Sequence, residues 1–164
     1  MYFKCINEGL GKAFMNVFAR DLIKINYYAL DKKSCLTEMS EFLFEQGIIK
    51  SQSGFLKDIL ERESLMSTGI GRKIAIPHTR SKEVTQLKIA VYLLDNELEF
   101  DSIDGELVKI IFMIAVPEEM KEMYMKVLSV ISNYFRNDEK RDKILSCNSK
   151  DDLFKLLKEI DDEI

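Results

Sequence analysis

VKIIFMIAV, residues Val108–Val116, is a nearly unbroken run of apolar side chains. A strand with one face in water alternates apolar and polar residues, whereas a strand that is covered on both faces can be apolar throughout. The run therefore predicts the central strand of a sheet that lies between two layers of helices. Pro117 follows the run and marks the turn toward the next element.

Weaker strand signals surround this run. Two of them, LKIAVYLL and the brief ELEF, precede it and lead into a turn at residues 101–105. A short apolar fragment ends at Pro77, and the alternating DLIKINYYAL lies near the start of the chain. The strands predicted before the central one are Asp21–Leu30, Ile74–Ile76, Leu87–Leu94 and Glu97–Phe100.

Helical periodicity separates these strands. Ser34 is expected to cap a first helix that Gly47 stops, and Ser53 is expected to begin a second helix that ends near Glu63. A long helix follows the central strand, and two short helices come last, the final one capped by Ser149. The interleaving of helices and strands predicts the α/β class, with a single mixed β-sheet flanked by helices on both faces.

The length of 164 residues suits one domain. We assign residues 21–164 to this domain and residues 1–20 to an N-terminal extension of uncertain role. Lys and Arg number 24 against 28 Asp and Glu, which gives a net charge of −4. This balance argues against a nucleic-acid partner, because phosphate backbones are bound by a basic face.

Composition also argues against membranes and metals. No apolar run approaches the length of a transmembrane helix, and the first residues lack the apolar core of a signal peptide. The three cysteines are scattered and show no Cys-x-x-Cys spacing, which fits a reducing compartment. We therefore expect a cytoplasmic protein that needs no cofactor or metal and does not insert into the membrane.

His78 is the single histidine of the chain and the best candidate for chemistry. It follows Pro77, which fixes the local backbone, and it comes just after a short apolar strand. Upstream, Thr68-Gly69-Ile70-Gly71 places two glycines in a tight loop, where backbone turns can present N–H groups to an anion. We expect His78 to be partly exposed in a shallow depression, where it could be phosphorylated.

ERESLMSTGIGRKIAIPH (Glu61–His78) resembles the active-site signature of the type-2 IIA domains of the bacterial sugar phosphotransferase system, which include fructose, mannitol and nitrogen-regulatory branches. Members of that family show an R-E pair, then T-G-I-G, then I-A-[IV]-P-H. DSIDGELVKIIFMIAVPEE (Asp101–Glu119) is similar to a second segment of the family. The resemblance covers residues 22–162, nearly the whole chain.

The resemblance implies a role for each matching residue. His78 is then the phosphorylated residue, and Arg62 is the catalytic cation that holds the phosphoryl group. Thr68, Gly69 and Gly71 are expected to bind the phosphoryl group as substrate. The implied function is that of a phosphotransferase that carries phosphoryl groups between proteins: it accepts the group from the small carrier HPr and passes it to a cysteine of a IIB protein or domain. A homodimer is left open.

Three positions near the motif need separate expectations. Lys73 stands where many members of the family have glycine. Lys73 and its neighbour Arg72 could add positive charge near the phosphoryl group or point to solvent, and we expect them to point to solvent. Met123 takes the place of a second histidine found in many fructose and mannitol members, and methionine cannot donate a hydrogen bond to a phosphoryl oxygen. Glu63, beside Arg62, is expected to lie in water.

An alternative function uses the same chemistry for another purpose. Domains of this family also occur in transcription regulators and antiterminators, where they sense phosphorylation rather than deliver phosphoryl groups to a sugar. The missing second histidine and the unassigned residues 1–20 favour this alternative. The sequence does not identify a sugar.

Overall fold

β6 (Val108–Pro117) lies in the middle of the sheet, as its apolar sequence predicts. In the computed structural model, which describes residues 16–164, nearly every side chain of this strand is buried. β5 (Lys88–Leu98) pairs with β6 antiparallel on one side. On the other side, β3 (Ile74–Ala75) and β4 (His78–Ser81) both pair with β6 in parallel.

The outer strands make the sheet mixed. β1 (Ile23–Tyr27) joins β5 in parallel, and β2 (Gly69–Gly71) joins β3 antiparallel. The order across the described sheet is therefore β1-β5-β6-β3-β2, with β4 continuing the line of β3 along β6.

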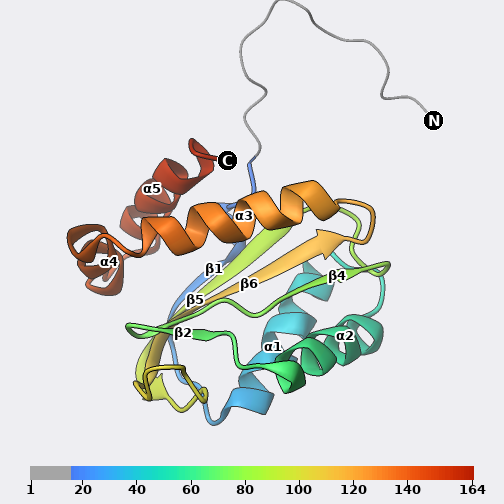
Figure 1. Cartoon of the computed structure of the whole chain (residues 1–164), viewed down its shortest axis with the longest axis horizontal. Helices are drawn as coiled ribbons and strands as arrows, with labels where there is room; N and C mark the ends of the chain where they lie inside the picture. Colours follow the sequence, from blue (N-terminus) through green and yellow to red (C-terminus); the bar gives the residue numbers. More distant parts are fainter. Residues whose placement is uncertain (1–15) are drawn as a thin grey trace, which may run out of the picture.

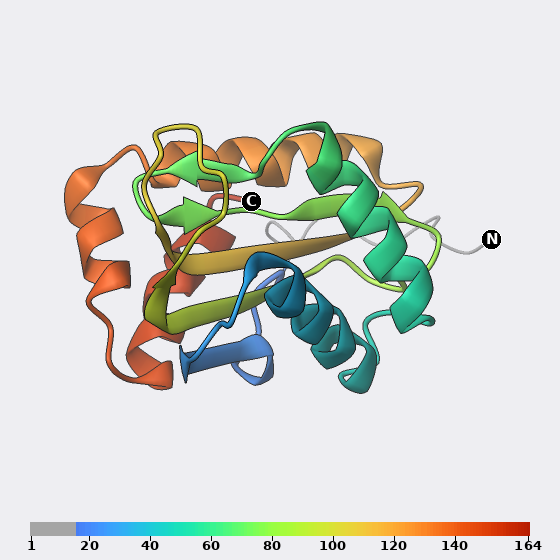
Figure 2. The same cartoon turned by 90° about the horizontal axis from the view of Figure 1, so that it is seen from below.

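Helices cover both faces of the sheet (Figure 1). α1 and α2 lie against one face, and Figure 2 shows this pair in front of the strands. α3 lies across the opposite face, and α4 and α5 are on the same side. Each face has its own apolar core, and the predicted fold class is confirmed. The helix bounds are α1 (Lys32–Glu45), α2 (Gln52–Leu65), α3 (Lys121–Tyr134), α4 (Asp138–Leu145) and α5 (Lys150–Asp161), and a 3-10 turn at Arg20–Leu22 precedes β1.

The predicted cap of the first helix is wrong, and the second helix starts slightly earlier than predicted. The Asp31 carboxylate accepts the Ser34 N–H at 2.7 Å, so Asp31 rather than Ser34 caps α1. The Ser51 hydroxyl accepts the Gly54 N–H at 3.1 Å and caps α2, which begins at Gln52, one residue before the predicted start at Ser53. In both helices the acceptor is a polar side chain that lies three residues before the N–H group that donates to it, as is usual for the first turn of a helix.

Other boundaries follow the sequence more closely. Gly47 ends the region of α1 with a φ of 74°, and the Ser149 hydroxyl caps α5, both as predicted. The short strand expected at Glu97–Phe100 is not separate, because β5 continues to Leu98. The polar residues His78–Ser81 form β4, which no hydrophobic pattern predicts.

A break between β3 and β4 shapes the surroundings of His78. The two short strands keep one register along β6, as if they were a single strand. Between them, Ile76 donates its N–H to the carbonyl oxygen of Thr68 at 2.9 Å, and the Pro77 carbonyl oxygen accepts the N–H of Ile114 in β6 at 2.9 Å. Pro77 follows and has no N–H to offer to β6. His78 is thus the first residue after the break, on a strand that the central β6 holds in place.

The two sequence motifs pack directly against each other. A β-carbon at Gly69 would lie 2.4 Å from Ser102 Oγ and 2.9 Å from Ser102 Cα. Gly71 has a φ of +90°, and a β-carbon there would lie 2.7 Å from Asp104 Oδ2. The same carboxylate accepts the N–H of Arg72 at 2.8 Å. Both glycines are therefore required by the close approach of the loop that follows β5.

The start of the described chain is tied to α5. The buried Val17 donates its N–H to Asp161 Oδ1 at 2.9 Å. The Lys158 ammonium reaches Asn16 Oδ1 at 2.8 Å. The predicted N-terminal extension lies largely outside the described residues, and the domain boundary at residue 21 stays a prediction. No helix in the described part is both long and apolar enough to cross a membrane.

Candidate functional site

His78 is buried, with 7% of its surface exposed, at the first position of β4. Its Nδ1 atom lies 2.6 Å from the carbonyl oxygen of Ile76, two residues earlier. A carbonyl oxygen can only accept a hydrogen bond, so Nδ1 carries the ring proton. The neutral imidazole therefore has its free lone pair on Nε2.

The Nε2 atom reaches a cavity. Nε2 makes no hydrogen bond to a described residue. It is also not fully buried, so it keeps some accessible surface. His78 lines a cavity of about 610 Å³, so the expected exposure is corrected: the ring is covered, and one edge keeps access to this space. The other lining residues are Arg62, Met66, Ser67, Thr68, Gly69, Ile70, Ile76, Asp101, Ile103, Leu128 and Ser132.

Arg62 lines the same cavity although it lies in a different element. It sits in the last turn of α2, a helix that packs beside β4. Its Nη1 donates to the carbonyl oxygen of Met66 at 2.9 Å, which fixes the guanidinium at the end of the helix. The remaining N–H groups make no hydrogen bond to a described residue, so the cation can still receive an anion.

The surroundings favour the neutral form of His78. Burial is the main cause that lowers the pKa of His78 below its ordinary value, and the positive charge of Arg62 acts in the same direction. The hydrogen bond to Ile76 and the charge of Glu63 act in the opposite direction, with a smaller combined effect on the pKa. A ring that stays neutral at neutral pH is a ring that can act as a nucleophile.

Glu63 is buried rather than in water, contrary to the sequence-based expectation. Its Oε1 accepts the N–H of Thr68 at 2.8 Å, and its Oε2 accepts the Thr68 hydroxyl at 2.6 Å. The ammonium of Lys32 lies 2.9 Å from Oε1 and balances the charge. Lys32 comes from α1, so no local pattern in the motif could have indicated this contact.

The loop amides that were expected to bind a phosphoryl group already have partners inside the protein. Glu63 holds the N–H of Thr68, and the N–H of Gly69 donates to Ser67 Oγ at 3.1 Å. Thr68 and Gly69 line the His78 cavity, whereas Gly71 lines a neighbouring one. The substrate-binding role of these three residues stays a prediction.

Tyr124 is the α3 residue that lies beside His78. The two ring centroids are 5.5 Å apart, and the Arg80 guanidinium carbon lies 5.8 Å from the Tyr124 centroid. Met123, the residue expected at the second-histidine place, packs against the apolar core under α3 and is not among the cavity-lining residues. Helical periodicity places residues on a face of a helix but does not indicate which side chain of another element that face contacts, so the sequence did not predict contact between Tyr124 and His78.

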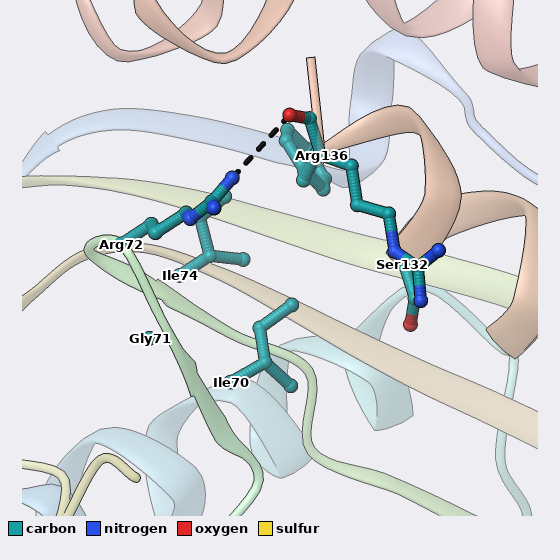
Figure 3. Close-up of a pocket in the computed structure, with 7 residues that line it drawn as sticks. Ile70, Gly71, Arg72, Ile74, Ser132 and Arg136 are labelled. Carbon is teal, nitrogen blue, oxygen red and sulfur yellow. Dashed lines mark hydrogen bonds between the residues drawn. The ribbon is translucent and has the colours of Figure 1, made fainter. Parts of the chain in front are cut away.

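A second, smaller cavity adjoins the first. Its volume is about 290 Å³, and it shares Ile70 and Ser132 with the His78 cavity. Figure 3 shows Arg72 on this cavity, with its guanidinium donating to the carbonyl oxygen of Arg136 at 3.3 Å. Arg72 is not among the residues that line the His78 cavity.

The neighbouring Lys73 has a partner of its own. Its ammonium pairs with Glu97 at 2.6 Å, and about half of the Lys73 side chain is exposed. Arg72 and Lys73 are both exposed, as expected, and each also makes a contact at the surface.

Known proteins resemble the chain over almost all of its described length. The family model described as "Phosphoenolpyruvate-dependent sugar phosphotransferase system, EIIA 2" matches residues 16–160. The fructose-specific EIIABC component of Bacillus subtilis is 30% identical over 145 residues, which cover 88% of this chain. The chain spans 23% of that relative, so the two proteins are alike in only one part of the larger one.

Solved structures resemble the chain as well. The nitrogen regulatory protein IIA-Ntr from Neisseria meningitidis superposes with a TM-score of 0.81 and 27% identity, over 87% of this chain and 97% of that one. The mannitol enzyme IIA of Escherichia coli, solved in complex with phosphorylated mannitol enzyme IIB, has a TM-score of 0.73 and 18% identity, over 87% of this chain and 99% of that one. The second match supports the fold.

Proposed function

The chain belongs to the EIIA type-2 family of the phosphoenolpyruvate-dependent sugar phosphotransferase system, and we propose that it carries a phosphoryl group on Nε2 of His78 between two protein partners. One observation supports this assignment most directly. The Ile76 carbonyl keeps the proton on Nδ1, while the opposite edge of the ring has access to a cavity that Arg62 also lines. The neutral imidazole of His78 and the guanidinium that would bind its phosphoryl group thus line the same cavity.

Phosphoryl transfer at this site needs no loss or gain of protons. The lone pair of His78 Nε2 attacks the phosphorus of a donor phosphohistidine in line, so that a P–N bond forms at His78 while the donor's P–N bond breaks. The donor imidazole leaves with the electron pair of that bond. The His78 proton stays on Nδ1, and the Ile76 carbonyl stabilises the positive charge that grows on the ring.

Arg62 is the residue that we assign to the phosphoryl oxygens. A planar guanidinium offers two parallel N–H donors, which match the oxygens of a phosphoryl group. Its contact with Met66 leaves such donors available at the cavity. Thr68 and Gly69 line the same cavity, and we assign them to shaping it, while Gly71 supports the turn behind them.

The partners follow from the family. We propose a IIB protein or domain as the acceptor, which is supported by the mannitol enzyme IIA of Escherichia coli having been solved with phosphorylated IIB. We propose HPr as the donor of the phosphoryl group. The activity is that of a phosphocarrier, since the protein is itself phosphorylated and returns to its starting state after the transfer.

The similarity to IIA-Ntr favours a second candidate function. That protein is named as a nitrogen regulatory protein, and 97% of its length aligns with this chain. In this alternative, His78 undergoes the same chemistry but the phosphorylated state is read by a regulatory partner. The sequence and the fold are compatible with both purposes, so the acceptor distinguishes them.

Incubation with phosphoenolpyruvate, Enzyme I and HPr tests the phosphocarrier assignment. We expect acid-labile phosphate on the intact protein by mass spectrometry, and none on His78→Gln. Arg62→Gln should slow uptake by about 10²–10³, the usual loss when one donor to a developing charge is removed. Normal folding without uptake from any phosphorylated HPr would contradict the assignment.

A second incubation separates the two purposes. The phosphorylated protein is mixed with a fructose-type or mannitol-type IIB protein that has its acceptor cysteine. Transfer to that cysteine supports sugar transport. Stable phosphohistidine in the presence of each IIB protein supports the regulatory alternative.

A further inference from the structure

Glu63 is the buried carboxylate that lies nearest to the proposed chemistry. It is 8% exposed, at the end of α2 beside Arg62. Both of its oxygens accept hydrogen bonds from Thr68, and Lys32 supplies the balancing charge at 2.9 Å. Burying a carboxylate is costly unless it is paired and hydrogen-bonded, and this one is fully satisfied. Thr68 alone uses two donors to hold it.

A continuous hydrogen-bonded path leads from this carboxylate to the histidine. Glu63 fixes the N–H and hydroxyl of Thr68. The Thr68 carbonyl oxygen accepts the N–H of Ile76 at 2.9 Å. The carbonyl of Ile76 then accepts the Nδ1 proton of His78 at 2.6 Å. Each link fixes the orientation of the next peptide or ring, and the path passes through the break between β3 and β4.

We propose that Glu63 is a positioning residue: held by Lys32, it fixes Thr68, and through Thr68 and Ile76 it sets which nitrogen of His78 faces the cavity. Glu63 itself does not touch the phosphoryl group. The role rests on the proposed phosphocarrier function, since it concerns the same histidine. Its structural part, the control of the His78 tautomer, can be measured without any transfer.

The charges around the ring come from several elements. α2 supplies Arg62 and Glu63, and the loop after β5 supplies Asp101 at the cavity wall, while the ring of Tyr124 on α3 lies beside the imidazole without adding a charge. Lys32 lies 3.6 Å from Asp101 Oδ2 as well as against Glu63, so one ammonium links the buried path to the cavity wall. Replacing Glu63 therefore changes the environment of His78 without removing a group that contacts the ring.

The test compares Glu63→Gln with Glu61→Gln. Glu61 lies on the same helix, is exposed, and makes only a 3.9 Å pair with Lys57, so its variant removes a carboxylate that the path does not use. Because the chain has a single histidine, two-bond ¹H–¹⁵N spectra report its tautomer without assignment. We expect the intact protein and Glu61→Gln to show Nδ1–H, and Glu63→Gln to show a mixture of tautomers.

Transfer supplies the second readout. We expect phosphoryl uptake by Glu63→Gln to fall by about tenfold to a hundredfold, the scale of the loss when a reacting group is misplaced. Thr68→Val, which removes only the hydroxyl link, should show a smaller loss, and Thr68→Ser should restore uptake and tautomer. If Glu63→Gln does not fold, the Thr68 pair decides the outcome.

Two results would overturn the proposal. One is an unchanged His78 tautomer in folded Glu63→Gln, whatever happens to the rate. The other is a Thr68→Val protein whose tautomer and uptake both match those of Thr68→Ser. If the intact protein takes up no phosphoryl group, the phosphocarrier function fails, while the tautomer spectra still decide whether Glu63 positions the ring.

Discussion

Burial decides the chemistry of His78 at the scale of a single residue. A solvated histidine is partly protonated near neutral pH, and a protonated ring has no lone pair with which to attack phosphorus. In this site the covered ring and the nearby Arg62 favour the neutral form, while the Ile76 carbonyl selects the tautomer. The reactive nitrogen is therefore ready without a separate general base.

The pH dependence of uptake and stability follows from this burial. The pKa of His78 lies below the ordinary value of about 6.5, so uptake should stay constant through neutral pH and fall only in more acidic solution. In that acidic window the unfolded chain holds a proton that the folded chain lacks, so stability falls as the pH falls. As the pH is lowered from neutral into this window, the free energy of unfolding of His78→Gln should therefore decrease less than that of the intact protein.

An NMR titration of the histidine and thermal unfolding of both proteins check this prediction. The glutamine variant is the control for the carboxylates, whose titration both proteins share. A His78 pKa above the ordinary value, or identical acid profiles for the two proteins, would contradict it.

At the scale of elements, the β2–β3 hairpin shows how a loop motif depends on backbone conformation. Arg72 and Lys73 form its turn with φ values of 54° and 71°, which ordinary side chains rarely adopt. Lys73 compensates in part through its 2.6 Å pair with Glu97, but exposed pairs contribute little to stability. Glycine suits this backbone better, because it has no β-carbon.

Lys73→Gly and Lys73→Ala separate these effects. Both variants lose the pair with Glu97, and only the alanine keeps a β-carbon in the left-handed region. We expect the free energy of unfolding of Lys73→Gly to be about 1 kcal/mol higher than that of Lys73→Ala. The strain of one residue in the left-handed region is of this size. Urea denaturation measures the difference, and an equally stable alanine variant would argue against a strained turn.

The same elements show how far the sequence could predict this site. The apolar run of β6 and the helical stripes were readable because burial imposes a periodic pattern. β4 could not be predicted in this way, because its polar residues show no strand pattern and it is a strand only through its pairing with β6. The burial of Glu63 was also missed, since its counter-charge Lys32 lies on another helix. Contact of Tyr124 with His78 likewise depends on how α3 crosses the sheet.

At the scale of the whole molecule, Asp161 joins the two ends of the described chain. It is 4% exposed and accepts the N–H of Val17, which belongs to the segment before β1. Burial raises the pKa of Asp161, while the hydrogen bond from Val17 and the charge of Lys158 partly offset this effect. The side chain is thus buried at a cost in stability, and in return it satisfies the N–H group of Val17.

Asp161→Ala and Asp161→Asn should differ for this reason. Alanine leaves the Val17 N–H without a partner, and we expect a loss of about 1–3 kcal/mol in the free energy of unfolding. Asparagine keeps an oxygen acceptor and removes the desolvated charge, so we expect stability close to that of the intact protein. Denaturant melts of the two variants give the comparison. An asparagine variant as unstable as the alanine variant would show that the charge, rather than the acceptor, is what matters.

The contact between residue 17 and α5 has a consequence for any protein that contains this domain next to others. Both ends of the described chain meet near the β1 edge, whereas the His78 cavity lies toward β3 and β2, at the other edge of the sheet. A module joined to either end is thus tethered on one side of the molecule. The points of attachment are thus at the opposite edge of the sheet from the cavity, at which a diffusing protein partner would meet the histidine.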